Sequence, residues 1–309
     1  MKHDSIVVRV PASTSNLGSG FDTLGLALRL YNHVEVMRTR TKRFEISSAF
    51  SRDRQAKAEQ LITEAAVLFF RRGRIRQFGF SVKLSGEVPI GRGLGASAIL
   101  RVGIIAGLNK LANAGFTRQQ ILEMATELEG HPDNASPAIF GGLTVSGRIA
   151  ESVRCINFPV SSKLKFVTLI PSFEISTEAA RKLMPTIYSK ADALHALNRA
   201  ALIAAAFAKG DHQRLRGLFD DRIHQPYRAR LLPALNRVIR AGERAGAIGG
   251  WLSGSGSSII CVTLERPQAV ARAMQRELPD SVVRVLMSDP TGFGITYSKI
   301  LFTGLTPAG

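Results

Sequence analysis

The stretch Pro89-Ile-Gly-Arg-Gly-Leu-Gly-Ala-Ser-Ala98 is a glycine-rich turn between two regular patterns. Before it, apolar and polar residues alternate from Phe78 to Leu84, which predicts a half-buried strand. After it, residues 98–112 are apolar on nearly all sides, which predicts a helix buried inside a domain. Glycines let a backbone approach a ligand closely, and a helix N-terminus favours an anion. The stretch therefore predicts an anion-binding loop, with a purely structural turn as the alternative.

This loop differs from two common nucleotide-binding motifs. It does not end in the Gly-Lys-Ser/Thr of a Walker loop, and its glycine spacing is not that of a Rossmann fingerprint. Ser97 stands where a hydroxyl could reach a phosphate or a metal. The loop therefore indicates phosphate binding of another kind.

The length and composition indicate a globular protein that is not embedded in a membrane. A chain of 309 residues with 45% hydrophobic content can form one large or two medium domains. The longest apolar run, residues 200–208, is too short to cross a bilayer, and residues 6–10 predict a strand rather than a signal peptide. Cys155 and Cys261 lie in apolar runs, which predicts buried free thiols in a reducing cytoplasm.

The chain is strongly basic, with 41 Lys and Arg against 24 Asp and Glu, which gives a net charge of +17. Basic clusters occur at residues 38–43 and 71–76. Such a surface can bind nucleic acid, steer an anionic substrate, or simply be a solvated basic face. Aromatic residues do not alternate with the basic ones, and no nucleic-acid motif is present. We therefore do not expect a nucleic-acid partner.

Two further segments of the first half carry candidate functional residues. The polar loop at residues 11–25 holds Asn16 and Asp22, although both residue types also suit plain turns. A capping box of Thr117 and Gln120 predicts a helix. That helix leads into the turn Glu129-Gly-His-Pro-Asp-Asn134, which is dense in chemically active side chains.

The pattern changes near residue 150. Strands and helices follow, with a third glycine cluster, Ser253-Gly-Ser-Gly256, before an apolar strand. This order predicts an α+β protein of two closely packed halves. We place the two domains at residues 1–150 and 151–309.

The loops at residues 11–25, 91–98 and 253–256 together resemble those of the GHMP kinases, and within them the homoserine kinases. Four segments carry the closer resemblance: Asn16-Leu-Gly-Ser-Gly-Phe-Asp-Thr-Leu-Gly25, Glu129-Gly-His-Pro-Asp-Asn134, Thr177-Glu-Ala-Ala-Arg181 and His224-Gln-Pro-Tyr-Arg228. The similarity extends from about Val7 to Ile260. It implies a two-domain GHMP kinase fold, with a first half like ribosomal protein S5 domain 2 and a ferredoxin-like second half.

The chain departs from the family pattern at two places. Ala96 replaces the first serine of the usual Gly-Leu-Gly-Ser-Ser-Ala, and Ser255-Gly-Ser257 replaces the usual Ala-Gly-Pro. Ser97 is kept, and neither change removes a charged group.

The resemblance implies transfer of the γ-phosphoryl group of ATP to the side-chain hydroxyl of L-homoserine, with Mg²⁺. Ser97 would contact the metal, together with Glu123, which lies eleven residues before Asn134; Glu129 is the second choice. Gln60 lies near the segment that binds the adenine in the family. The expected nucleotide-binding residues are Pro89, Ile90, Gly91, Arg92, Gly93, Leu94, Gly95, Ala96 and Ser97.

The resemblance also assigns the substrate contacts. Asp22, with Asn16 beside it, would bind the ammonium group of homoserine, and Arg181 and Arg228 its carboxylate. Asn134 would orient the hydroxyl, so that Asn134 and Asp22 are the expected catalytic residues. His131 would order the turn or contact the substrate.

Two alternatives remain at this point. One is a GHMP kinase of another small alcohol, although two arginines favour an amino-acid carboxylate over an isoprenoid. The other is a non-catalytic protein that uses its basic surface to bind nucleic acid; retention of Ser97, Glu123, Asp22 and Asn134 favours a kinase. The family further implies a homodimer and a cytoplasmic location.

Overall fold

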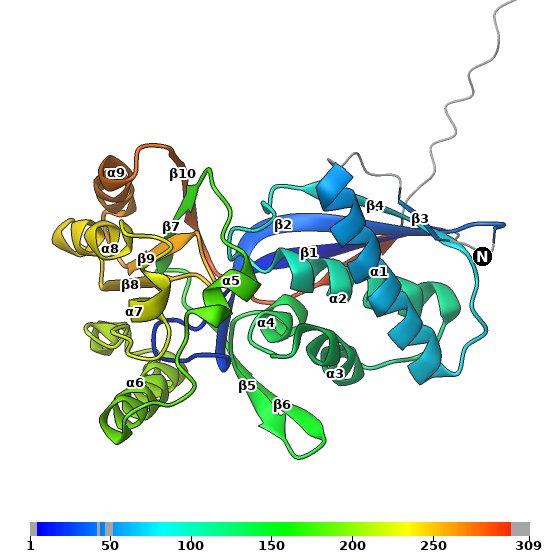
Figure 1. Ribbon diagram of the computed structural model, residues 1–309, viewed down its shortest axis with the longest axis horizontal. Coiled ribbons are helices and arrows are strands. Elements are labelled where there is room, and N and C mark those ends of the chain that lie inside the picture. Colours follow the sequence, from blue (N-terminus) through cyan, green and yellow to red (C-terminus); the bar gives the residue numbers. More distant parts are fainter. Residues whose placement is uncertain (1–4, 42–43, 47–51, 298–309) are drawn as a thin grey trace, which may run out of the picture.

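The computed structural model describes residues 5–41, 44–46 and 52–297. Two β-sheets stand side by side, each with helices on one face (Figure 1), which confirms the α+β prediction. Lys42 and Arg43, from the first basic cluster, lie outside the described residues.

The first half is a mixed sheet covered on one side by helices. Among the described residues its strand order is β11-β1-β2-β4-β3, and the hairpin β5–β6 is attached to the end of β2. The elements are β1 (Ser5–Ser15), β2 (Leu24–Arg38), β3 (Phe44–Ile46), α1 (Arg52–Gly73), β4 (Phe80–Gly86), α2 (Ala96–Ala112), α3 (Arg118–Glu129), α4 (Ala135–Phe140), β5 (Leu143–Ile149) and β6 (Ser152–Phe158).

The second half is an antiparallel sheet in the order β10-β7-β9-β8. The elements are β7 (Lys165–Pro171), α5 (Thr177–Lys182), α6 (Lys190–Lys209), η1 (His212–Leu215), α7 (Gln225–Arg228), α8 (Leu235–Arg244), β8 (Gly249–Leu252), β9 (Ile259–Thr263), α9 (Pro267–Glu277), β10 (Ser281–Leu286) and β11 (Gly294–Tyr297). The path β7-α8-β8-β9-α9-β10 is the ferredoxin-like arrangement, with α5, α6 and α7 inserted after β7.

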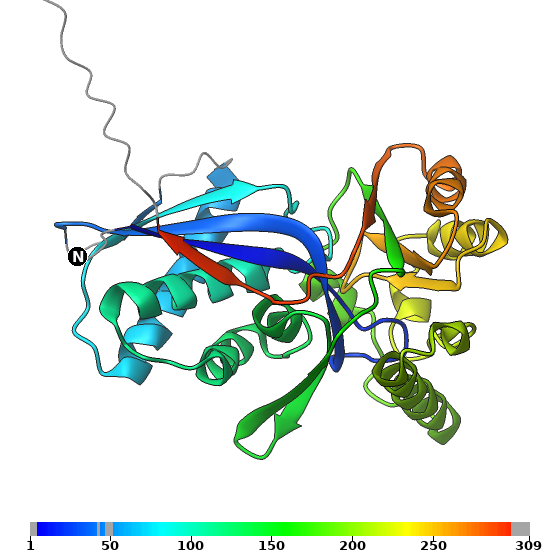
Figure 2. The ribbon, with the colours of Figure 1, turned by 180° about the vertical axis from the view of Figure 1, so that it is seen from behind.

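The predicted boundary at residue 150 falls inside a hairpin. Strand β6 pairs with β5 along its whole length, so the first sheet continues to Phe158 and the second begins at Lys165. The chain then returns to the first sheet at its end, where β11 pairs with β1 (Figure 2). The chain therefore cannot be divided into these two halves at a single residue.

Helix α2 fills the middle of the first half, as its apolar pattern predicts. Its residues 98–108 are buried, and it packs against β1 and β2. The contact with β2 is close because Gly103 and Gly107 face Val34 and Val36. The predicted capping box of α3 is also present, since Thr117 and Gln120 each accept the other's backbone N–H.

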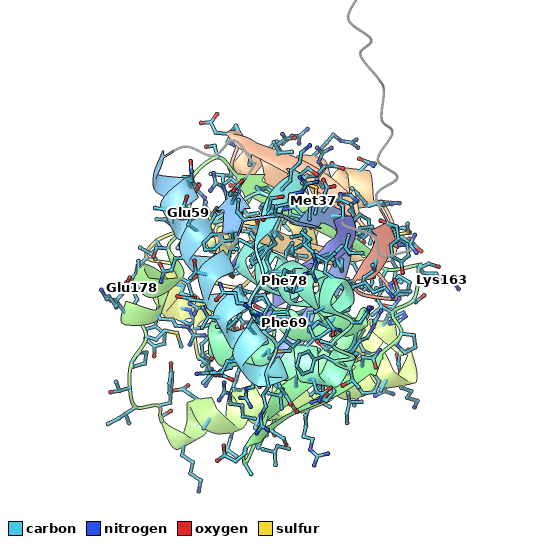
Figure 3. All side chains as sticks on the ribbon, turned by 90° about the vertical axis from the view of Figure 1, so that its right-hand side faces the viewer. Met37, Glu59, Phe69, Phe78, Lys163 and Glu178 are labelled. Carbon is cyan, nitrogen blue, oxygen red and sulfur yellow. The ribbon has the colours of Figure 1, made fainter. Side chains whose placement is uncertain are left out.

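An aromatic cluster closes the end of the first half that lies farthest from the second. The ring of Phe69 packs edge-on against Phe70 and Phe116, and Phe70 packs against Phe78, with centroids 5.1–5.7 Å apart (Figure 3). This packing anchors α1 to the segment that enters β4.

Both cysteines are free thiols, as predicted. Cys261 is buried, whereas Cys155 is only partly buried; burial raises the pKa of Cys155 to about 11. In the described part of the chain, no helix combines the length and apolarity needed to span a membrane.

We predict that Gly103→Ala destabilises the protein by about 1–2 kcal/mol. A Cβ at this position would lie 2.4 Å from Val34 Cγ2, and the overlap outweighs the higher helix propensity of alanine. Urea unfolding measures the change. Gly147→Ala is the control, because its Cβ would meet no atom within 4 Å. An equal loss in both variants would contradict the close α2–β2 contact.

Candidate functional site

The glycines of the 89–98 loop are required by both conformation and space. Gly91, Gly93 and Gly95 have φ values of 69°, 72° and 74°, in the left-handed region that favours glycine. A Cβ on Gly93 would lie 2.1 Å from the carbonyl oxygen of Ser253, and one on Gly95 would lie 2.1 Å from Ser13 Oγ. The loop is therefore enclosed by other segments, as a purely local turn would not be.

Four successive carbonyl groups of this loop accept hydrogen bonds from three distant segments. The bonds are Ile175 N–H to Gly91 O (3.3 Å), Ser258 N–H to Arg92 O (3.1 Å), Ser253 Oγ to Gly93 O (2.6 Å) and Ser13 N–H to Leu94 O (3.2 Å). Three of the four donors belong to the second half of the molecule. These bonds fix the path of the loop.

The N–H groups of the same loop remain available. None from residues 91–97 donates a hydrogen bond to another residue in the described ranges. Those at the start of α2 belong to the first turn of a helix, which has no internal partners. No acidic side chain lies in that first turn. The loop is thus a set of donors suited to phosphate oxygens.

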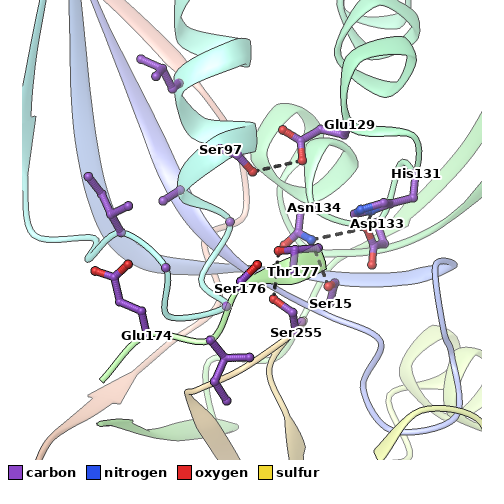
Figure 4. A pocket seen from close by; sticks show the side chains of 18 of the residues that line it. Ser15, Ser97, Glu129, His131, Asp133, Asn134, Glu174, Ser176, Thr177 and Ser255 are labelled. Atoms are coloured by element: carbon purple, nitrogen blue, oxygen red, sulfur yellow. Dashed lines mark hydrogen bonds and ion pairs between the residues drawn. The ribbon is translucent and has the colours of Figure 1, made fainter. Parts of the chain in front are cut away.

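The loop opens into a cavity of about 490 Å³ lined by both halves (Figure 4). Of the predicted nucleotide-binding residues, six line it: Ile90, Gly91, Gly93, Gly95, Ala96 and Ser97. Three do not, namely Pro89, Arg92 and Leu94. Leu94 is buried in the core.

Arg92 binds the second half of the molecule instead of facing the cavity. Its guanidinium donates to the carbonyls of Pro171 (2.9 Å) and Ser172 (2.5 Å) and pairs with Glu174 (3.2 Å). Any contact of Arg92 with the nucleotide would therefore be made by its backbone N–H and not by its side chain. Arg92 acts as a link between the loop and β7.

A hydroxyl and a carboxylate meet beside the start of α2. Ser97 Oγ donates to Glu129 Oε2 at 3.0 Å (Figure 4), and Arg101 donates to Glu129 Oε1 at 2.6 Å. Arg101 also binds Glu64 at 3.0 Å. Ser97 and Arg101 are one helical turn apart, so both reach the same carboxylate. Arg101 orients Glu129, a role that sequence reasoning missed.

Glu123, the first choice for the metal, does not lie here. It accepts a hydrogen bond from Gln119 (3.3 Å) and does not line the cavity. Six residues separate it from Glu129, which on a helix turns its side chain by about 120° to another face. The geometry replaces Glu123 by Glu129 as the candidate metal carboxylate.

At the opposite side of the cavity, Asp22 and Arg181 form a two-bond ion pair. The nitrogens of Arg181 lie 2.8 and 3.2 Å from the two oxygens of Asp22. Asn16 accepts the N–H of Asp22 (3.1 Å) and donates to Gly254 O (3.2 Å). These three predicted residues, from the 11–25 loop and α5, therefore come together.

Arg228, the second predicted arginine, is buried beside this pair. It donates to Gly254 O at 2.9 Å, and the ring of Phe21 lies 5.2 Å from its guanidinium and 5.4 Å from that of Arg181. Burial and the charge of Arg181 lower the pKa of Arg228 to about 10, so it stays protonated at neutral pH. Arg181 and Arg228 thus place two guanidinium groups on this side of the cavity, close to the carboxylates of Asp22 and Asp133.

Asn134 is held between two serines at the middle of the cavity. Its Oδ1 accepts from Ser13 Oγ (2.9 Å), and its Nδ2 donates to Ser15 Oγ (3.0 Å; Figure 4). These bonds fix the orientation of the amide. Asn134 lines the same cavity as the glycine loop and Asp22.

Asp133 is a buried carboxylate that sequence reasoning did not single out. Its Oδ1 contacts His131 Nδ1 (Figure 4). Burial lowers the pKa of His131, but the hydrogen bond and charge of Asp133 outweigh it and leave that pKa raised. Ligand atoms of Asp22, His131 and Asp133 lie within 4.8 Å of one another, which suits a cationic group. In the sequence, the signal for Asp133 was its position between His131 and Asn134, which were both candidate site residues.

The other end of the cavity is mostly apolar. Its walls are Ala58, Leu61, Leu84, Ile90 and Leu100, with Lys57 and Asn32 at the edge. Gln60, placed near the adenine by the resemblance, is exposed, donates to Glu64 (2.9 Å) and does not line the cavity. In the sequence, the signal for this apolar wall was the spacing of Ala58 and Leu61, which lie three residues apart on one face of α1.

The altered third loop is held by its own hydroxyl groups. Ser257 Oγ donates to Phe173 O (2.7 Å), and Ser255 Oγ lies 3.2 Å from Thr177 Oγ1 (Figure 4). Ala96 lines the cavity through the start of α2. Neither departure disturbs the contact between the loops.

Comparison with known proteins places these features in one family. Residues 60–142 match the GHMP kinases N terminal domain, and residues 203–280 match the GHMP kinases C terminal family. The homoserine kinase of Clostridium acetobutylicum is 37% identical over 264 residues, 84% of this chain and 88% of that protein. That of Caldicellulosiruptor saccharolyticus is 39% identical over 258 residues, 83% of each chain. The crystal structure of homoserine kinase from Cytophaga hutchinsonii matches with a TM-score of 0.87 at 26% identity, over 96% of this chain and 98% of that one.

We predict that Asp133→Asn lowers stability by an amount that depends on pH. The pKa of His131 is raised in the folded state, so its stabilising contribution is complete below pH ~6.5 and is lost as pH rises through the folded-state pKa. The melting temperatures of wild type and Asp133→Asn should differ by a few degrees below pH 6 and converge toward pH 9. Glu178→Gln, which breaks an exposed pair with Lys182 and has no histidine beside it, is the control and should show no such trend between pH 6 and 9. A gap that widens with pH would refute the assignment.

Proposed function

This chain belongs to the homoserine kinase family of the GHMP kinases, and we infer that it phosphorylates the side-chain hydroxyl of L-homoserine with ATP. The product, O-phospho-L-homoserine, belongs to threonine biosynthesis. One observation carries the inference beyond the family. A loop of available N–H donors and a paired carboxylate and guanidinium line the same cavity, with a fixed amide between them.

The nucleotide occupies the side of the cavity formed by the glycine loop. The N–H groups of residues 91–97 bind the phosphate oxygens, and the dipole of α2 adds to the attraction. The apolar walls around Leu61, Leu84 and Ile90 accommodate the flat adenine ring. This arrangement points the terminal phosphate toward Asn134.

Ser97 and Glu129 fit a Mg²⁺ ion. Their oxygens lie 3.0 Å apart, and a hydroxyl with a carboxylate is a donor set that this cation accepts. Arg101 occupies the other oxygen of Glu129, so one oxygen stays directed at Ser97. When bound, the ion neutralises charge on the phosphates.

The amino-acid head of homoserine fits the Asp22–Arg181 pair. An α-ammonium and an α-carboxylate are adjacent, and so are the carboxylate of Asp22 and the guanidinium of Arg181. Asp22 takes the ammonium, and Arg181 with Arg228 takes the carboxylate, so each charge of the substrate meets a group of opposite charge. An alcohol without this head group would leave these charges unpaired.

The hydroxyl of the substrate is positioned by Asn134. An amide does not remove a proton at neutral pH, so Asn134 orients the hydroxyl and the proton passes to phosphate or solvent. Phosphoryl transfer depends more on alignment and charge neutralisation than on a strong base. His131, held by Asp133, keeps the turn in place beside the ammonium site.

We further propose that the protein is a cytoplasmic homodimer without a nucleic-acid partner. The two free thiols suit a reducing compartment. Part of the basic surface is already paired, since Arg71 and Arg72 bind Glu127 at 3.0 and 2.6 Å. The excess charge can serve to attract anionic ATP.

The first prediction concerns the substrate. Purified protein with Mg-ATP should phosphorylate L-homoserine in preference to L-serine, L-threonine, mevalonate and shikimate. Arg181→Ala and Arg228→Ala should each raise the KM for homoserine about 10–100-fold, because each removes a charged hydrogen-bond donor. The exposed Arg214→Ala is the control.

Other outcomes of this panel are equally informative. Preference for another alcohol would keep the phosphate loop and refute the roles of Asp22 and the two arginines. Nucleotide binding without any phosphorylation would implicate Ala96 and the loop at residues 255–257, and would favour a binding protein. Displacement of the protein from nucleic acid by salt would then test the basic surface.

The second prediction separates the two glutamates. Glu129→Gln should lower kcat/KM about 100-fold and weaken Mg²⁺-dependent nucleotide binding, because it removes the carboxylate beside Ser97. Glu123→Gln should leave both within twofold. Isothermal titration with a non-hydrolysable ATP analogue, with and without Mg²⁺, gives a readout apart from turnover. The reverse ranking would restore Glu123 as the metal ligand.

A further inference from the structure

The segment His224-Gln-Pro-Tyr-Arg228 begins with a histidine that the proposed reaction leaves unused. His224 is fully buried and stands directly before α7, the short helix that carries Arg228. It does not line the cavity, but its neighbours do. A buried ionisable side chain costs free energy unless its polar atoms are paired, so its partners show what it holds in place.

The two ring nitrogens of His224 face opposite kinds of partner. Nδ1 lies 3.3 Å from Arg228 Nη1, and an arginine nitrogen can only donate a hydrogen bond. Nε2 lies 2.9 Å from the carbonyl oxygen of Gly18 and 3.4 Å from Asp221 Oδ2, and both of these oxygens accept. The ring therefore carries its proton on Nε2 and accepts a hydrogen bond at Nδ1.

The surroundings of His224 keep the ring neutral. Burial lowers its pKa, and the charge of Arg228 adds to this, whereas Asp221 and Asp22 oppose the shift without reversing it. Asp221 is already bound by the backbone N–H groups of residues 223–225 at 2.7–2.9 Å. Neutrality matters because an imidazolium has no acceptor left for Arg228.

The hydrogen bond at Nδ1 helps to orient Arg228. Its Nη1 donates both to His224 and to the carbonyl oxygen of Gly254, at 2.9 Å, which engages the two hydrogens of that nitrogen. Within the described ranges Nε has no partner, and Nη2 contacts only the weak acceptor Met184 Sδ at 3.5 Å. The two acceptors at Nη1 therefore hold the guanidinium group and leave Nη2 available for a ligand oxygen.

The hydrogen bond at Nε2 holds the loop that carries Asp22. Gly18 belongs to this loop, which connects β1 to β2 and reaches the second half beside α7 (Figure 1). A Cβ on Gly18 would lie 2.3 Å from Phe219 O, so the loop lies directly against the segment before His224. The ring of Phe21 packs on His224 with centroids 5.3 Å apart. One imidazole thus contacts both sides of the site proposed for the amino-acid head.

We propose that neutral His224 is a positioning residue of this kinase, which accepts a hydrogen bond from Arg228, donates one to Gly18, and so fixes the carboxylate-binding arginine relative to the ammonium-binding loop. This role rests on the proposed binding of homoserine in the cavity. His224 would touch neither substrate nor nucleotide, so its replacement acts through Arg228 and Asp22. The KM for homoserine should therefore change more than the KM for ATP.

Two amide variants separate the two hydrogen bonds. The amide of His224→Gln reaches the position of Nε2 and keeps the donor to Gly18, whereas that of His224→Asn reaches the position of Nδ1 and keeps the acceptor for Arg228. His224→Gln should raise the KM for homoserine about 10-fold, because Arg228 loses an acceptor that orients it, and should leave the KM for ATP within about twofold. In an Arg228→Ala background, His224→Gln should add nothing, whereas His224→Asn should still raise the KM for homoserine.

The matched control is a second buried histidine. His195 bonds Asp220 at 3.1 Å, and neither residue lines the cavity. His195→Gln should leave both KM values unchanged, and circular dichroism shows whether each variant is folded. An equal rise of the homoserine KM on His224→Gln with and without Arg228 would refute the orienting role.

A measurement on the unchanged protein applies even if these variants do not fold. Two-bond ¹⁵N–¹H correlation of the labelled protein, after backbone assignment, distinguishes the two neutral tautomers and the imidazolium form of each of the six histidines. His224 should show the Nε2–H tautomer at pH 7, whereas the Nδ1–H tautomer or an imidazolium would overturn the proposal. If L-homoserine is not phosphorylated, the proposed function fails, while the tautomer still decides whether His224 accepts from Arg228.

Discussion

The backbone carbonyls from Gly91 to Leu94 determine how the two halves of this molecule meet. Each of them accepts a hydrogen bond from another segment, and three of those donors belong to the second half. The C=O and N–H of a trans peptide point in opposite directions, so each of these carbonyls directs the N–H of its own peptide away from the segment that it bonds, and these N–H groups remain available as donors. The glycines are needed because a side chain at Gly93 or Gly95 would collide with the segments that supply these bonds. A single conformation of this loop thus both joins the two halves and presents the N–H groups proposed to bind phosphate.

The charged and polar groups of the cavity are separated by position, whereas the chain as a whole has an excess of basic residues. N–H donors gather at the start of α2, one carboxylate lies beside Ser97, and a carboxylate with two guanidinium groups lies across from them. Each region of the cavity favours a ligand group whose charge is opposite to its own. The overall charge of +17 adds a general attraction for anions but does not select among them. In the proposed site, selection comes from the Asp22–Arg181 pair, because only a group with adjacent opposite charges satisfies both partners.

Local patterns in the sequence predicted local structure well. The capping box of Thr117 followed from spacing because its contacts lie within three residues, and the burial of α2 followed from a sequence that is apolar on nearly all sides. Asp22, Arg181 and Asn134 came from the resemblance and do meet in the cavity. The place of Glu123 outside the cavity and the contacts of Arg92 with the second half did not follow from the sequence, because the direction of a side chain depends on helix rotation and on partners far along the chain. The apolar end of the cavity has no motif, since any aliphatic residues of suitable size can form it. The pairing of β6 with β5 likewise depends on hydrogen bonds that composition does not reveal.

The return of the chain to its first sheet has a consequence for synthesis. Strand β11 is the last described element of the chain, yet it covers the edge of β1, which is made first. Until residue 297 has left the ribosome, the edge of β1 stays unpaired and can join another chain. The edge of β1 therefore stays exposed throughout the synthesis of the elements from β2 to β10. Deletion of β11 would make that exposure permanent, even though every residue of the cavity would still be present.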